Sequence, residues 1–409
     1  MKLYVSKTVG SALLVAGTQI GAGMLALPIS TGVAGFWPSA ALFIVAFLYM
    51  LASLFLLVEV NFWSHKVTAN IITLAREHLG LVGQIVAWVS FLMLLYAVAA
   101  AYISGGGSLL ASALQSGLTV SISDALGTWC FLAIFGGIVV FGTRILDGFN
   151  RILIGGLIAS FIFLIVFTSP NVSLADLHVG KPMYLFAAVP VVVLSFTSHI
   201  IVPSLRTYLA GDHKDLIRAL FWGSVIPLVF YLVWEFLIVG SLPSSGPFSL
   251  EAIARHNNPV SGLTKALNAK LHIPAVAIVV GFFSFFALVT SFFGVSLGLF
   301  DFLADGFRIK KTAIGKFLLL LMMYIPPMLF ALSYPEGFVF AVGYAGVFVA
   351  VLYGILPPIM IWKGRYIDKM ESDFVTPGGK LVPIIVFLGA FVIIFFQIGA
   401  TKGWFPSLQ

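Results

Sequence analysis

A pair of glycines interrupts the first long apolar run of this sequence, residues 8–35. Gly21 and Gly23 each cost about 1 kcal/mol in a helix interior, and Pro28 removes a backbone donor one turn further on. The pattern predicts a helix that breaks near residue 21 and leaves backbone N–H groups free to bind an anion. Small residues in membrane helices also serve close packing, which is the alternative role. We assign to this break Gln19, Gly21, Ala22, Gly23 and Met24.

A polar segment interrupts a later apolar run, residues 184–205, in the same way. Successive polar or aromatic side chains lie in its middle, and Pro203 follows them. Polar groups at membrane depth are costly unless they face a cavity. The segment therefore predicts a second broken helix, whose free carbonyl groups could bind a cation. We assign to this break Ser195, Phe196, Thr197, Ser198 and His199.

The two breaks together describe a site for a zwitterion. Free N–H groups carry partial positive charge and can hold a carboxylate, whereas free carbonyl groups can hold an ammonium group. An α-amino acid carries both groups. Aromatic side chains would line the rest of the site, and we select Phe196 and Tyr102, which lies in mid-run just before Ser104.

Ionisable residues inside apolar runs are candidate ion carriers. His199 comes first because the reference pKa of histidine, about 6.5, is close to neutral. Glu59 lies 38 residues after Gly21, and Glu235 lies 38 residues after Thr197. This repeated spacing favours two halves related by inversion, with the substrate between the breaks. Glu59 is the second candidate proton carrier, although an interfacial glutamate that reaches water would explain it equally.

The elements that must position these residues are membrane-spanning helices. The chain has 409 residues, of which 60% are hydrophobic and 9% charged, whereas a soluble domain has about 25% charged residues. A soluble globular protein is therefore excluded. The apolar runs are continuous rather than alternating, so they predict helices and not strands. The eleven predicted spans are 8–35, 38–63, 84–113, 127–142, 149–168, 184–205, 218–240, 273–303, 314–333, 337–361 and 381–401.

The basic residues orient these spans in a bacterial-type inner membrane. Seventeen of the 22 Lys and Arg residues fall on one predicted side, and five fall on the other. The positive-inside rule then places the N-terminus in the cytoplasm, and an odd number of spans places the C-terminus in the periplasm. The net charge of +7 is explained by these loops, so nucleic acid is not an expected partner. The five outer residues are Lys181, Arg255, Lys265, Lys270 and Lys402.

We expect one transmembrane domain over residues 1–409. Residues 8–168 would form the first five-helix repeat, 184–361 the second, inverted repeat, and 381–401 an extra helix. The outer loop 241–272 has helical spacing in two pieces, which would form either a lid or a passive surface loop.

Several segments resemble the hydroxy and aromatic amino acid permeases. Residues 17–28, Gly-Thr-Gln-Ile-Gly-Ala-Gly-Met-Leu-Ala-Leu-Pro, are similar to the first-helix signature of that family, and residues 195–206 are similar to its sixth span. Further similar segments are residues 234–235, 300–306 and 334–338. Within the family, the chain most resembles the bacterial tyrosine-specific permeases.

The resemblance implies an all-α, leucine-transporter-type fold with eleven spans, broken helices 1 and 6, and a 5+5 inverted repeat. It also implies ion-driven import of tyrosine or another aromatic amino acid. In that fold, the first break, here residues 21–23, receives the carboxylate, and the sixth-span break, here residues 195–197, receives the amine.

The coupling ion is left open between a proton, which the family favours, and sodium. Sodium-coupled relatives of this fold hold the ion between the first break and an A-x-x-T-S run in the eighth span. Ala287, Thr290 and Ser291 have that spacing and could hold sodium together with Gly21. Alternatively, the two hydroxyls bond carbonyl groups of their own helix. No other metal and no cofactor is expected.

Two other classes of function compete with transport. A channel or a substrate-sensing receptor could use the same fold without accumulating a solute. An intramembrane enzyme is poorly supported, because the chain has no H-E-x-x-H motif, Cys130 is its only cysteine, and no pair of carboxylates lies in mid-span. The expected partners are therefore a small-molecule substrate and membrane lipid, and the sequence does not give the oligomeric state.

Overall fold

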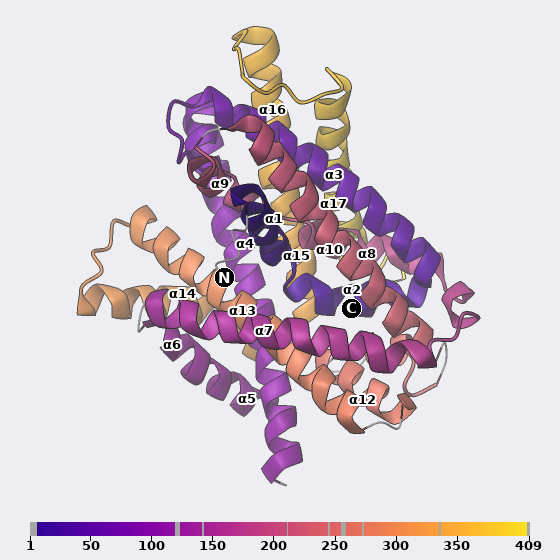
Figure 1. The fold of residues 1–409 in the computed structure, drawn as a ribbon. Helices are drawn as coiled ribbons and strands as arrows, with labels where there is room; N and C mark the ends of the chain where they lie inside the picture. The colour runs from indigo at the N-terminus through magenta and orange to yellow at the C-terminus, as the bar shows by residue number, and fades with distance from the viewer. Residues whose placement is uncertain are drawn as a thin grey trace.

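The computed structural model describes residues 6–118, 123–140, 143–210, 212–243, 246–254, 259–271, 274–334 and 337–406. Within these ranges all regular elements are helical (Figure 1). The α-helices are α1 (Lys7–Gln19), α2 (Ala22–Thr31), α3 (Phe36–Trp63), α4 (Ile71–Leu118), α5 (Asp124–Phe131), α6 (Gly137–Val140), α7 (Thr143–Thr168), α8 (Leu185–Ser195), α9 (Val202–Tyr208), α10 (His213–Ser241), α11 (Leu250–Ala254), α12 (Pro259–Leu271), α13 (Pro274–Gly306), α14 (Ala313–Ser333), α15 (Phe338–Val349), α16 (Leu356–Trp362) and α17 (Leu381–Thr401). Short 3₁₀ or π turns join several of them: η1 (Gly32–Ala34), η2 (Leu132–Gly136), η3 (Ser169–Asn171), η4 (Asp176–His178), η5 (Pro182–Tyr184), η6 (His199–Ile201), η7 (Ala350–Ile355) and η8 (Lys363–Ile367).

Side chains in the loops fix where several helices begin. The Asp212 carboxylate caps α10 by accepting hydrogen bonds from the N–H groups of Lys214, at 2.8 Å, and Asp215, at 3.1 Å. Thr312 caps α14 through the N–H of Gly315. These caps occupy N–H groups that have no partner inside the helix, and a cap of this kind contributes about 1 kcal/mol.

The described chain crosses a membrane many times, as predicted. Nine helices are long and apolar enough to span a bilayer, and the bent pair Lys7–Gln19 and Gly23–Ala34 makes a tenth. The predicted span 127–142 corresponds to a shorter apolar helix, Asp124–Val139. By length and composition the described residues therefore have nine or ten spans, and the number eleven remains a prediction.

One predicted span is much shorter than the helix that contains it. The run 84–113 is the middle of α4, which extends from Ile71 to Leu118. Gly80 bends this helix with a φ of 71°, a left-handed conformation that glycine adopts without strain. The first turns of this helix are polar, so an apolar run does not predict where the helix begins.

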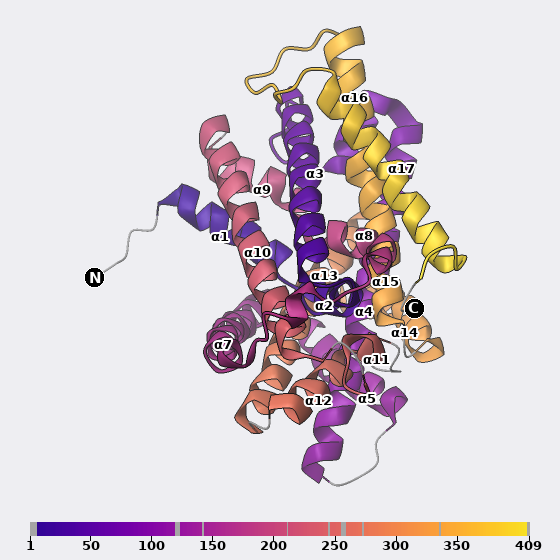
Figure 2. The ribbon, with the colours of Figure 1, turned by 90° about the vertical axis from the view of Figure 1, so that its right-hand side faces the viewer.

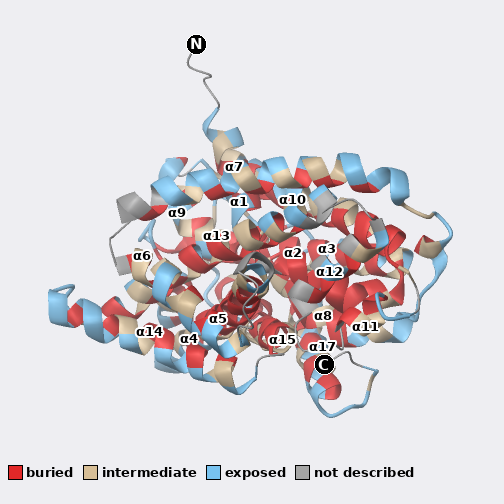
Figure 3. Cartoon of the chain, turned by 90° about the horizontal axis from the view of Figure 1, so that it is seen from below, coloured by how far each residue is buried: buried red, intermediate tan, exposed pale blue. Residues whose placement is uncertain are grey.

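The helices form one bundle with a buried centre. α3 and α10 run side by side through it, and α7 lies across the bundle against α13 (Figures 1 and 2). Buried residues gather in the middle, while the outer faces are largely exposed (Figure 3). Many of these exposed residues are large and apolar, as a lipid-facing surface requires; on α17 they include Leu388, Phe391, Val392 and Phe395.

Gly223 brings α10 close to α1. A Cβ atom at Gly223 of α10 would lie 2.5 Å from Cβ of Val15 and 2.7 Å from the carbonyl oxygen of Ala12, both on α1. Such close contact between backbones is how small residues stabilise helix pairs in membranes. The contact fixes α1 on one side and so positions its end, Gln19, in the bundle.

Candidate functional site

The first predicted break is present at residues 20–21. α1 ends at Gln19, α2 begins at Ala22, and the two helices are bent by 53°. Gly21 caps α2 without any side-chain hydrogen bond, and the N–H of Met24 is bonded to the Gly21 carbonyl oxygen at 3.0 Å. The N–H of Met24 is therefore already paired, and the N–H groups that precede it in α2 carry the partial positive charge of a helix N-terminus.

The second break lies at residues 196–198. α8 ends at Ser195, and the helical pattern resumes with η6 and then α9. The N–H groups of Phe196 and Thr197 bond to carbonyl groups three residues earlier, at 3.2 and 3.0 Å. The chain thus leaves the α-helical pattern where the run of polar residues predicted that it would.

The two breaks touch each other. A Cβ atom at Gly23 would overlap the Ser195 side chain and lie 3.0 Å from the Cα of Ser195. A Cβ atom at Gly21 would overlap the Ser291 hydroxyl and lie 3.6 Å from that of Tyr102. The structure therefore brings α2, α8, α13 and α4 together around two glycines, and only glycine leaves room for this approach.

A single phenol bridges the ends of the two broken helices. The Tyr231 hydroxyl on α10 lies 2.6 Å from the carbonyl oxygen of Gln19 and 3.1 Å from that of Ser195. The Gln19 side chain adds a second link, because its Nε2 donates to the hydroxyls of Ser198, at 2.9 Å, and Ser224, at 3.1 Å. All these groups are buried, so α10 holds both breaks by hydrogen bonds that water does not weaken.

Tyr231 and Ser224 are site residues that the helix breaks in the sequence do not predict. The signal that could have found them is their spacing with Glu235: positions 224, 231 and 235 lie on one face of a helix. A polar stripe in a run that is otherwise apolar marks the face that meets the site.

We expect Tyr231→Phe to lower the kcat/KM of uptake about tenfold. The change removes one buried hydrogen bond, which contributes roughly 1.5 kcal/mol, and keeps the ring. Tyr49→Phe is the matched control, because the Tyr49 hydroxyl also bonds a backbone carbonyl, that of Val386 at 3.0 Å, at another place. Equal kcat/KM for the two variants, measured as initial uptake rates, would contradict the role of Tyr231.

Two other predicted residues of the breaks are packed into the core. Phe196 is 2% exposed and meets the rings of Phe47 and Tyr231 edge-on. Met24 is fully buried. The backbone of Ala22 is described as the first residue of α2, but its side chain lies outside the described residues.

His199 is buried beside a cavity. Its Nε2 lies 3.0 Å from the Ser53 hydroxyl, and its ring stacks on Tyr353 with a centroid distance of 4.2 Å. The Ser53 hydroxyl donates its one hydrogen to the Tyr353 carbonyl at 2.6 Å, so Nε2 must donate to Ser53. Nδ1 is then the basic nitrogen, and it has no partner among the described residues.

The cavity beside His199 has a volume of about 400 Å³. We call it the His199 cavity. It lies between α3, α4, α9 and α13, and its lining includes His199, Pro203, Asp301, Asp305 and Tyr353. The predicted proton carrier at the second break therefore adjoins this cavity.

Glu59 forms a buried ion pair. Arg365 donates from Nε to Oε1 at 2.6 Å and from Nη2 to Oε2, and the backbone N–H of Thr376 bonds Oε2 at 2.7 Å. The side chains of Glu59 and Arg365 are 1% and 10% exposed. Glu59 is thus not an interfacial residue in contact with water, and its charge is matched by a guanidinium.

Only some of the residues that were proposed to bind sodium are placed to form a site. The Thr290 hydroxyl is bonded within its own helix, to the carbonyl oxygens of Phe286 at 2.8 Å and Ala287 at 3.1 Å. Ser291 adjoins Gly21, as described above. The bonds of Thr290 are those that hydroxyls commonly make in membrane helices. The described residues hold no cluster of three His, Cys, Asp or Glu side chains suited to a metal ion.

The architecture is similar to that of a solved transporter. The crystal structure of the Eremococcus coleocola manganese transporter, in complex with an aromatic bis-isothiourea substituted compound, aligns over 96% of this chain and 87% of that one. The TM-score is 0.58 and the sequence identity 14%, so the likeness concerns the fold alone.

The sequence has much nearer relatives. It is 36% identical to "Tyrosine-specific transport system 1" of Haemophilus influenzae, over 98% of this chain and 99% of that one. It is 35% identical to "Tyrosine-specific transport system 2" and 30% identical to a "Tryptophan-specific transport protein" of the same organism, again over 97–98% of both chains. These relatives are transport proteins and not enzymes. Residues 5–397 match the tryptophan/tyrosine permease family, and the chain belongs to that family.

Proposed function

We propose that this protein is an ion-coupled importer of aromatic amino acids, with L-tyrosine as the first substrate to test. The observation that carries the proposal is the contact between the two helix breaks at Gly23 and Ser195. The N–H groups that begin α2 would bind the carboxylate, and the carbonyl groups that end α8 would bind the ammonium group. The Tyr102 hydroxyl would lie 3.6 Å from a Cβ atom built at Gly21, so Tyr102 would line the space for the aromatic ring of the substrate. The tyrosine- and tryptophan-specific relatives support this substrate class.

The proposed topology has eleven spans in a bacterial inner membrane. Residues 8–168 and 184–361 would form the two inverted repeats, and residues 381–401 the extra helix. The N-terminus would be cytoplasmic and the C-terminus periplasmic. In this orientation α10 ends at the outer face, and the His199 cavity lies on the cytoplasmic side. The two breaks, one in each proposed repeat, support the arrangement.

We propose a proton as the coupling ion and His199 as a carrier. The imidazole lies next to the second break and carries a basic nitrogen with no described partner. Glu59 is the weaker candidate, because a proton on its carboxylate would break the ion pair with Arg365. Sodium at Gly21, Ala287, Thr290 and Ser291 is the alternative, and the internal bonds of Thr290 favour the proton over it.

Uptake of radiolabelled tyrosine into proteoliposomes tests the proposal. An inward proton gradient is expected to drive accumulation, and a protonophore is expected to abolish it. If uptake does not depend on any imposed ion gradient, the proposal of ion coupling is wrong. Binding without accumulation would instead favour a channel or a substrate-sensing receptor built on this fold.

The double variant Thr290→Ala and Ser291→Ala separates the two coupling ions. Under proton coupling we expect proton-driven uptake within about twofold of the unmodified protein, because the Thr290 hydroxyl serves its own helix. The comparison is made with and without external sodium. If the unmodified protein needs sodium and the double variant loses that dependence, sodium is the coupling ion.

A further inference from the structure

A buried carboxyl group on α10 takes no part in the site described above. Glu235 is fully buried. Its Oε1 lies 2.7 Å from the Thr31 hydroxyl, which also lies 2.8 Å from the carbonyl oxygen of Leu27, and its Oε2 has no hydrogen-bond partner among the described residues. Ser39 lies beside the carboxyl group, but its hydroxyl is bonded to the backbone carbonyls of Thr31, at 3.0 Å, and Gly35, at 2.7 Å. One oxygen of the carboxyl group is therefore available to hold a proton.

Glu235 differs sharply from its counterpart, Glu59. Each lies 38 residues after a helix break, and each is 0% exposed. Glu59 is matched by Arg365, whereas the described residues place no ion pair on Glu235. An unmatched charge in the protein interior costs several kcal/mol. The carboxyl group of Glu235 can lose that charge only by binding a proton or another cation.

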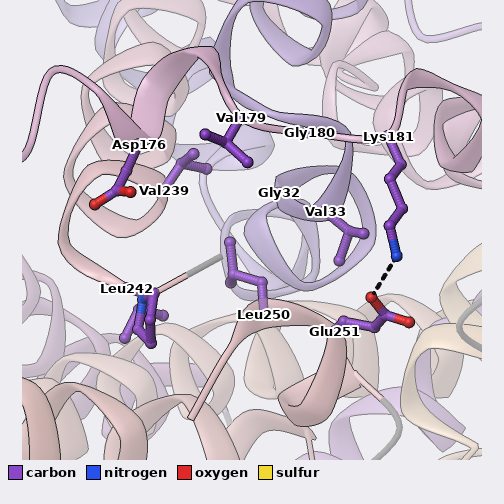
Figure 4. Close-up of a pocket in the computed structure, with 11 residues that line it drawn as sticks. Gly32, Val33, Asp176, Val179, Gly180, Lys181, Val239, Leu242, Leu250 and Glu251 are labelled. Atoms are coloured by element: carbon purple, nitrogen blue, oxygen red, sulfur yellow. Dashed lines mark hydrogen bonds and ion pairs between the residues drawn. The ribbon is translucent and has the colours of Figure 1, made fainter. Parts of the chain in front are cut away.

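A cavity of about 240 Å³ reaches the level just beyond Glu235. We call it the Lys181 cavity (Figure 4). Its lining includes Gly32, the residue after Thr31, and Val239, one helical turn after Glu235 on α10. At its rim Lys181 pairs with Glu251 of α11 at 2.9 Å. In the proposed orientation this cavity is on the outer side, and its lining comes within one residue of Thr31 and one helical turn of Glu235.

The same carboxyl group is connected to the two helix breaks. Tyr231, whose hydroxyl bridges the ends of α1 and α8, lies one turn before Glu235 on α10. Thr31, the partner of Glu235, is the last residue of α2, and the first turn of α2 is the proposed carboxylate site. One helix of ten residues thus joins the amino acid site to Glu235.

We propose that Glu235, held by Thr31, takes up the coupling proton from the Lys181 cavity. This inference rests on the proposed function. The proton passes from a hydronium ion in the cavity to the carboxylate, where it forms an O–H bond, and a water molecule remains. After the conformational change that exposes the site to the cytoplasm, the same O–H bond breaks and the proton returns to water through His199, the carrier proposed above for the cytoplasmic side.

Other charged or titratable groups lie on the elements around α10. α2 and η1 carry none. Lys181 and Glu251 face each other across the rim of the Lys181 cavity, and Asp176 also lines it. The remaining groups on elements packed against α10 are Lys7 on α1, Tyr49 and Glu59 on α3, Arg144, Asp147 and Arg151 on α7, His178 on η4, Arg206 and Tyr208 on α9, and Lys265 and Lys270 on α12.

The experiment compares two activities of Glu235→Gln in proteoliposomes at zero membrane potential. The amide keeps the shape of the carboxyl group but cannot exchange a proton. With a gradient of one pH unit, a one-proton symporter accumulates tyrosine up to about tenfold. For the variant we expect the ratio of internal to external tyrosine to stay close to one. Exchange of labelled for unlabelled tyrosine at equal pH is expected to continue. Glu251→Gln, at the cavity rim, is the matched control and is expected to accumulate like the unmodified protein.

Three outcomes overturn the inference. Glu235→Gln could accumulate tyrosine as the unmodified protein does, or Glu251→Gln could lose accumulation in its place. If Glu235→Gln fails to fold, a second experiment tests the inference. It measures how tyrosine exchange depends on pH in Thr31→Val and in Thr31→Ser. The inference requires that the pH dependence of exchange changes in Thr31→Val but not in Thr31→Ser. If it is unchanged in both variants, the proposed role of Glu235 and Thr31 is wrong. An unmodified protein that exchanges tyrosine but ignores the pH gradient would instead contradict the proposed function.

Discussion

Gly23→Val is expected to abolish tyrosine binding and uptake. The Cβ atom alone would overlap the Ser195 side chain and lie 3.0 Å from its Cα, and valine adds two methyl groups. Ser195 ends α8, and the one hydrogen of the Tyr231 hydroxyl is shared between the last carbonyl groups of α1 and α8, so this hydroxyl holds the two helix ends together. Overpacking of this kind costs roughly 3 kcal/mol, which corresponds to about a hundredfold loss of affinity.

A substitution on the neighbouring helix controls for effects of glycine replacement itself. A Cβ atom at Gly17, on α1, would have no neighbour within 4 Å. Gly17→Ala is therefore expected to bind tyrosine normally, whereas Gly23→Ala already meets Ser195. Equilibrium binding of labelled tyrosine to the purified proteins measures both. Normal binding by Gly23→Val would show that the contact between the breaks is not the substrate site.

Arg365→Met is expected to cause the largest loss of stability. The change leaves the buried carboxylate of Glu59 with only the N–H of Thr376 as a partner among the described residues. Removing one member of a buried ion pair costs roughly 3–5 kcal/mol. We expect a clearly lower apparent Tm, measured by heating the detergent-solubilised protein and following the monodisperse fraction.

The double variant Glu59→Gln and Arg365→Met tests the cause of that loss. It removes both charges, so it is expected to recover much of the stability lost in Arg365→Met. If the double variant is no more stable than Arg365→Met, lost packing rather than an unmatched charge explains the effect. A normal Tm for Arg365→Met would show that the pair contributes little.

The sequence predicted the two breaks well because their causes are local. Glycine and proline disfavour a helix wherever they occur, and polar residues in an apolar run need a cavity or partner in any fold. Gly21, Gly23 and Ser195 therefore stood out without any knowledge of their neighbours. The end of α1 at Gln19 and the start of α2 at Ala22 agree with this prediction, and the close contacts of both glycines show that they also have the packing role.

The partners of these residues could not be predicted, because they come from distant parts of the chain. Arg365 lies 306 positions after Glu59, and Tyr231 lies 212 positions after Gln19. Glu59 accordingly looked like an interfacial residue or a proton carrier, and its ion pair could not be seen. Helix packing alone brings such residues together, and apolar periodicity does not contain that information.

The same limit applies to the helix ends. The start of α4 at Ile71 carries Arg76, Glu77 and His78, so an apolar run marks only its middle. The segment 127–142 is apolar, yet a π turn at Leu132–Gly136 interrupts its regular helix. Hydrophobicity locates the part of a helix that meets lipid, whereas caps and kinks decide where the helix begins and ends.

Glycine-mediated packing of α1 on α10 leaves the opposite face of α1 to the bilayer. Val9, Leu13 and Leu14 on that face are all more than half exposed. In the proposed topology, acyl chains would complete the packing of the short helix that ends at the proposed substrate site. A bilayer of different thickness changes the tilt that suits such a helix, at a cost of a fraction of a kcal/mol per ångström. In that topology, the lipid composition of the host membrane would help to set the angle between α1 and α2.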